Sequence, residues 1–186
     1  HFFVRADPTN EKIVLEVVRR LLAQKQFDKV LALLVKATAS PKAPAKMHAL
    51  LSIAYAQNGK LDLARIAAEG AIRMAPESIL GYKTLIQVSQ NEMKGGAKRL
   101  PQIHKTLDQA FAQKKPNIAF QVELALMAAG YLELDKAATD DFKPRIRKLL
   151  DAAWASKPEV PLMIEQIGRG YRMIDARKEA AAVMEA

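Results

Sequence analysis

The residues that could carry chemistry in this chain are few and isolated. The three histidines stand at positions 1, 48 and 104, and no two of them have the spacing of metal ligands on one helical face. His48 falls where a bulky buried side chain is expected, so we interpret it as a packed core residue. His104 lies mid-helix among lysines and is expected to be a solvated surface residue. The histidines therefore predict no metal site.

Carboxylates and glycines also give no catalytic pattern. Asp140 and Asp141 are adjacent and precede Pro144, which is typical of a helix start, so we interpret them as capping residues and not as an acid–base pair. The diglycine Gly95-Gly96 lacks the remaining spacing of a phosphate loop. The chain has no cysteine, which excludes a thiol nucleophile and cysteine-ligated metals. We expect no enzyme activity, no catalytic residues and no cofactor.

The elements that would position any site are predicted to be helices throughout. Helix-forming residues dominate, β-branched runs are scarce, and no window alternates with period two. Proline, glycine and capping residues divide the chain into ten helical windows, and the prediction is an all-α protein. The first eight windows lie at about 13–22, 30–37, 45–57, 61–75, 78–91, 98–114, 118–132 and 140–156, a ninth follows Pro158 and Pro161, and a tenth begins around Asp175.

The predicted helices follow a sequence pattern that repeats along the chain. Between Ala45 and Ser78 the chain places small and large apolar residues at set points: His48, Leu51, Ser52 and Tyr55 in one helix, Gly59 at the turn, then Ala64, Ala71 and Pro76. Comparable patterns begin 34 residues earlier at Glu11 and 34 later at Ile79, then 42 further at Gln121 and 40 further at Pro161. Tyrosines recur at matched points as Tyr55, Tyr131 and Tyr171, where we expect them to fill gaps between closely packed helices. Gly168 and Gly170 are expected to allow similar close packing.

This pattern resembles the tetratricopeptide repeat, and the resemblance covers nearly the whole chain. It implies a right-handed α-solenoid of about five antiparallel helix pairs. The expected organisation is a lead-in over 1–10 and a single domain over 11–186, with repeats at about 11–44, 45–78, 79–116, 121–158 and 161–186.

The resemblance also implies a working surface. In this family the first helix of each repeat lines a concave groove that receives an extended or helical peptide. The positions that usually face it are here Lys12, Arg19, Lys46, Ile53, Gln57, Lys83, Gln87, Asn91, Arg169 and Arg172, over an aliphatic floor that includes Leu15, Ala49, Leu80, Val122, Ala125 and Ala129. Cations and amides there could bind carboxylates and backbone carbonyls. We expect a protein-interaction module that binds a peptide segment, acidic or C-terminal, with Arg19, Lys46, Lys83 and Arg169 as anchors.

Two other functions stay open. The chain could be a structural or assembly subunit that docks through its convex face or its C-terminal end, including self-association through the last helix. The excess of 29 basic over 20 acidic residues, a formal charge of +9, could instead serve RNA or DNA. The basic residues form no compact run, and few aromatics lie on the groove side, so nucleic acid ranks third.

The compartment is not fixed by the sequence. No apolar stretch approaches the roughly 20 residues of a membrane helix. The chain lacks a starting methionine and is expected to be an excised or processed piece. A cytoplasmic location is slightly favoured over a periplasmic or membrane-anchored one.

Overall fold

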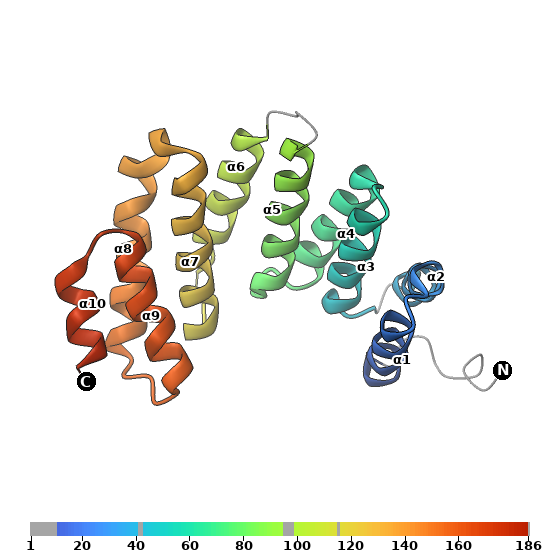
Figure 1. The fold of residues 1–186 in the computed structure, drawn as a ribbon, viewed down its shortest axis with the longest axis horizontal. Coiled ribbons are helices and arrows are strands. Elements are labelled where there is room, and N and C mark those ends of the chain that lie inside the picture. The colour runs from blue at the N-terminus through green and yellow to red at the C-terminus, as the bar shows by residue number, and fades with distance from the viewer. Residues whose placement is uncertain (1–10, 41–42, 95–98, 115, 186) are drawn as a thin grey trace. The chain divides into compact units, whose positions relative to one another are not determined.

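The computed structural model describes residues 11–40, 43–94, 99–114 and 116–185. Within this part of the chain there are ten α-helices, one short 3-10 helix and no strand (Figure 1). The all-α prediction is therefore confirmed. In chain order the elements are α1 (Glu11–Ala23), α2 (Phe27–Thr38), α3 (Ala45–Gln57), α4 (Leu61–Met74), α5 (Ile79–Lys94), α6 (Leu100–Phe111), α7 (Ile118–Leu134), η2 (Lys136–Ala138), α8 (Thr139–Ala155), α9 (Pro161–Met173) and α10 (Arg177–Met184).

The chain forms two compact units, His1–Arg99 and Leu100–Ala186. Their boundary falls inside the predicted third repeat, 79–116. The lead-in predicted over 1–10 lies outside the described residues. The single domain and its repeat boundaries stay predictions. No helix among the described residues has both the length and the apolar character needed to cross a bilayer.

In the first unit, small residues let neighbouring helices pack closely. α1 packs against α2 and α3 against α4, while α5 contacts both α3 and α4. Ser52, Ala64 and Ala71 are all buried, as the repeat pattern predicts. A close approach of two helices lies at Gly81 in α5, where an added Cβ would be 2.8 Å from the backbone nitrogen of Ile72 in α4. Only glycine fits there without a shift of the helices.

A buried carboxylate also joins α4 and α5. Glu92 is only 6% exposed and forms ion pairs with Arg65 of α4 and with Arg99, whose Nε lies 2.8 Å from Glu92 Oε2. The contact between Arg99 and Glu92 is short enough for a hydrogen bond, but its geometry is not that of one. Because a buried charge needs compensation, the two guanidiniums make burial of Glu92 possible.

In the second unit, two tyrosines fill the spaces between helices. α7 contacts α6, α8 and α9, and α9 packs against α10. Tyr131 and Tyr171 are each 2% exposed. The Tyr131 hydroxyl lies 2.9 Å from Asp135 Oδ2, and the Tyr171 hydroxyl donates to Asp151 Oδ1 at 2.7 Å. Burial, and then the hydrogen bond to the aspartate, raises the pKa of each tyrosine. The expected filling role is confirmed for both, whereas Tyr55 is only half-buried.

Three helix pairs share one turn geometry. Lys25, Gly59 and Asp175 have φ angles of 56°, 70° and 59°, in the left-handed region. In each turn the amide of the next residue donates across the helix end at 2.9 Å: Gln26 to Leu21, Lys60 to Tyr55 and Ala176 to Tyr171. These bonds define a Schellman-type helix end. The three positions correspond in the repeat, although only one holds the expected glycine.

Two interpretations of polar residues from the sequence are wrong. Asp140 and Asp141 lie within the first turn of α8, whose N-cap residue is Ala138 without a side-chain cap bond. The Asp141 carboxylate instead contacts Arg145 and His104. His104 is not a freely solvated residue, because its ring packs at 4.6 Å from the Phe142 ring and its side chain is 36% exposed.

Candidate protein-binding groove

The candidate site lies on neighbouring first helices of the first unit. α3 and α5 are in contact, and each presents residues at intervals of about one helical turn. On α3 these are Ile53 and Gln57, and on α5 they are Gln87 and Asn91. The helical period therefore brings four of the residues predicted from the sequence onto adjacent faces.

The four side chains line one pocket of about 80 Å³, together with Ser52, Ala56, Thr84 and Val88. Its rim is rich in carboxamides, each of which can both donate and accept hydrogen bonds. Thr84 takes little part in this chemistry, because its hydroxyl donates to the Leu80 and Gly81 carbonyls at 3.1 and 2.9 Å. The pocket is thus suited to polar groups such as a peptide backbone.

Ser52 gives the pocket an unsatisfied polar group. The residue is 0% exposed, and its hydroxyl has no hydrogen-bond partner among the described residues. A buried polar atom without a partner costs about 1–3 kcal/mol. The hydroxyl has almost no accessible surface, so it belongs to the packed wall of the pocket. A small residue was expected at this position for close helix packing, and the burial of Ser52 agrees with that expectation.

A second, more apolar pocket of about 70 Å³ adjoins the first. It shares Ile53 and Gln57 with the first pocket and is otherwise lined mainly by aliphatic and aromatic side chains: Val18, Phe27, Val30, Leu34, Leu50, Ala54 and Asn58. Phe27 is 45% exposed. The two pockets therefore form a continuous surface with an apolar end and an amide-rich end.

The cations predicted for the first unit are exposed, and carboxylates lie close to Arg19 and Lys46. Arg19 pairs with Glu16 at 3.5 Å on the same helix. Lys46 lies 3.8 Å from Glu11, and this pair joins α3 to α1. Lys12 and Lys83 are exposed on α1 and α5. Arg19 and Lys46 would have to leave or share these partners to bind a ligand carboxylate.

The remaining predicted residues lie in the second unit. Arg169 and Arg172 are exposed on α9. Part of the predicted aliphatic floor is inaccessible, because Ala49, Val122, Ala125 and Ala129 are buried in helix packing. The resemblance to the tetratricopeptide repeat placed these four residues in the groove, and that assignment is wrong.

His48 occupies a niche beside the second helix of its pair. An added Cβ at Gly70 would lie 3.2 Å from His48 Nδ1, so the absence of a side chain at residue 70 makes room for the imidazole. Burial, with a smaller contribution from the Arg73 charge, lowers the pKa of His48. The expectation of a packed histidine is supported, although the residue is half-buried.

Comparisons with known proteins agree with this architecture. No family model matches the chain, and no curated protein matches it. Among solved structures, the chain is similar to nearly identical TPR-like repeats of a protein described as a Podosopora anserina kinesin light chain. The TM-score is 0.56 at 17% identity, over 96% of this chain and 92% of that one. A related structure of the same repeats gives a TM-score of 0.55 at 16% identity, over 97% and 94%. At such identities the likeness shows the fold, and the predicted tetratricopeptide-like helical repeat is confirmed.

Proposed function

We propose that the chain is an interaction scaffold whose first unit binds a peptide segment of a partner protein. Helical-repeat folds commonly present extended surfaces to other proteins. The observation that carries the proposal is the pocket in which Ile53 and the carboxamides of Gln57, Gln87 and Asn91 come together.

The chemistry of the two pockets favours an extended segment with an apolar side chain. The carboxamides of Gln57, Gln87 and Asn91 can pair with backbone N–H and C=O groups, which every peptide offers. The adjoining apolar pocket would receive one side chain beside Ile53 and Phe27. The excess of basic residues favours segments that also carry acidic residues.

A peptide library displayed on phage would test this with the full chain as bait. Selected peptides should bind the parent and lose at least about tenfold in affinity when Gln87→Ala and Asn91→Ala are combined, which corresponds to about 1.4 kcal/mol. Gln109→Ala, an exposed amide on α6 in the other unit, is the matched control and should leave binding unchanged. Helical circular dichroism should be the same for all variants. Peptides that bind the double variant as tightly as the parent would refute the location of the site.

A second candidate function is self-association through the C-terminal end. Leu162 on α9 and Met184 on α10 are 61% and 60% exposed, which is high for large apolar side chains. Sedimentation of the full chain over a wide concentration range tests this candidate. A mass that rises with concentration and returns to the monomer value in Leu162→Lys would support it, whereas a constant monomer mass would refute it.

A further inference from the structure

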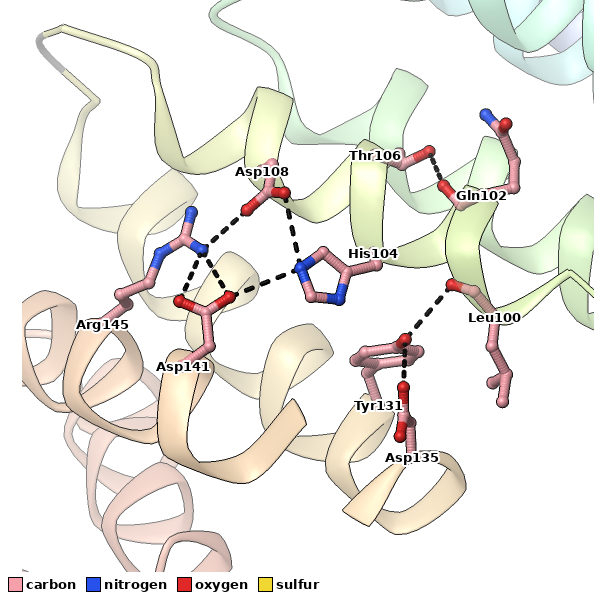
Figure 2. A network of polar contacts seen from close by, with 9 residues as sticks. All are labelled: Leu100, Gln102, His104, Thr106, Asp108, Tyr131, Asp135, Asp141 and Arg145. Atoms are coloured by element: carbon pink, nitrogen blue, oxygen red, sulfur yellow. Dashed lines mark hydrogen bonds and ion pairs between the residues drawn. The ribbon is translucent and has the colours of Figure 1, made fainter. Parts of the chain in front are cut away.

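A histidine and two aspartates, none of them assigned to peptide binding, converge in the second unit (Figure 2). His104 and Asp108 lie four residues apart on α6 and therefore share one helical face. Asp141 approaches from the first turn of α8. His104 Nε2 lies 3.5 Å from Asp108 Oδ2 and 3.4 Å from Asp141 Oδ2.

These separations match a metal coordination sphere. Donor atoms about 2.0–2.2 Å from a tetrahedral zinc ion lie about 3.3–3.6 Å from one another. The two distances from the imidazole nitrogen fall in or near this range, and all three donor atoms lie within 4.8 Å of one another. Bringing the two carboxylate oxygens to the same separation would complete the triangle.

Neighbouring side chains hold these donors in place. Arg145 Nη1 lies 2.7 Å from Asp108 Oδ1, which leaves Asp108 Oδ2 directed toward the imidazole, and 3.3 Å from Asp141 Oδ2. The guanidinium itself is fixed over the Phe111 ring, 4.2 Å from its centroid. The His104 ring packs against Phe142. Such outer contacts orient the carboxylate and imidazole ligands of metal sites.

The cluster also has room for further ligands. His104 and Asp108 line an open cavity of about 380 Å³ together with Leu100, Lys105, Tyr131 and Asp135. Asp141 does not line this cavity, so water in it reaches the cluster from the side of His104 and Asp108. Three protein ligands with an open position are the usual arrangement of a solvent-accessible zinc site.

We propose that His104 Nε2, Asp108 Oδ2 and Asp141 Oδ2 bind one divalent transition-metal ion of the Zn²⁺ class. One nitrogen and two oxygen donors suit such an ion. The competing explanation is that Arg145 compensates the charge of the two carboxylates and that no metal binds. The two explanations differ in their response to added zinc.

Isothermal titration of the full chain with zinc chloride tests the proposal. We expect saturable binding of one equivalent of Zn²⁺. Asp141→Asn, at an exposed carboxylate, should weaken it at least about tenfold, since loss of a ligand should cost no less than loss of an outer-shell partner. Asp140→Asn, at the adjacent exposed carboxylate, is the matched control and should bind Zn²⁺ like the parent.

A second pair of variants separates the site from other histidines. His104→Gln should lose affinity as Asp141→Asn does, whereas His48→Gln should retain it. Circular dichroism of each variant reports whether the fold is kept. The proposal is overturned by absence of saturable binding, or by zinc affinity that either Asp141→Asn or His104→Gln leaves unchanged. Because no peptide is present in the titration, failure here leaves the peptide-binding test unaffected.

Discussion

At the scale of single residues, two glycines on helices have opposite surroundings. Gly81 faces the backbone of α4 at a distance that excludes a Cβ, whereas nothing lies within 4 Å of a Cβ added at Gly130 of α7. We expect Gly81→Ala to destabilise the protein by about 1–3 kcal/mol, because the two helices must move apart. Gly130→Ala is the control and should stabilise it by about 0.5–1 kcal/mol, because alanine loses less backbone entropy in a helix. Urea unfolding of both variants checks the pair, and equal effects would contradict it.

The half-buried His48 predicts a pH dependence with a definite sign. Its pKa is lowered in the folded state from the ordinary value of 6.5, so the unfolded chain binds the proton more tightly. The stability that depends on neutral His48 is therefore fully present above pH 6.5 and is lost as the pH falls through the lowered pKa. The difference in unfolding free energy between parent and His48→Gln should shift in favour of the variant in acid. A difference that is constant with pH would contradict this account.

The tyrosines at matching repeat positions should not be equivalent. Tyr171 is almost fully buried and bonded to Asp151, so Tyr171→Ala should cost about 3–5 kcal/mol. Tyr55 is half-buried, and Tyr55→Ala should cost about 1–2 kcal/mol. Denaturant unfolding of the two variants measures both values. A larger loss of unfolding free energy in Tyr55→Ala than in Tyr171→Ala would mean that exposure of the side chain does not govern its contribution to stability.

At the scale of the elements, a substitution in the turn between two paired helices should raise the stability of the protein. Lys25 has a left-handed backbone conformation that strains a residue with a Cβ. Lys25→Gly should stabilise the protein by about 0.4–1 kcal/mol, because glycine removes this strain at the cost of a more flexible unfolded chain. Lys25→Ala removes the same charge without relieving the backbone and should give no such gain. Thermal unfolding of both variants separates the two effects.

The helices themselves could be predicted from the sequence because their determinants are local. Apolar periodicity, Pro76 and the Asn58-Gly59 turn are read from neighbouring residues, and α3 ends at Gln57 as expected. The left-handed turns at Lys25 and Asp175 could not be predicted this way. Lysine does not favour that conformation and aspartate adopts it less readily than glycine, so the docking of the paired helices helps to impose it.

Contacts between helices that are far apart in the sequence could not be predicted from the sequence pattern. Asp108 and Arg145 are 37 residues apart and meet only because α6 and α8 both pack around α7. Spacing along one chain could not show that His104 would face Asp141.

For the candidate groove, periodicity placed Ile53, Gln57, Gln87 and Asn91 on accessible faces. It could not separate them from the buried Ala49 or Val122, because burial depends on the next helix pair.

At the scale of the whole molecule, the charge of +9 predicts how partner binding depends on salt. Attraction between an acidic peptide and this surface should weaken as salt rises, since the screening length falls to about 10 Å at 0.1 M ionic strength. A peptide with the same sequence but with glutamines in place of its acidic residues should bind with little salt dependence. Fluorescence anisotropy of both peptides at low and high salt tests this. Equal salt dependence would mean that carboxylates are not recognised.

The recurring left-handed turn has a consequence for the exchange of residues between repeats. Lysine, glycine and aspartate adopt one backbone geometry at one repeat position, with the same amide bridge closing each helix end. The residues at this position should therefore be interchangeable: a variant in which Lys25 and Asp175 trade places should fold as the parent does, because both side chains are exposed.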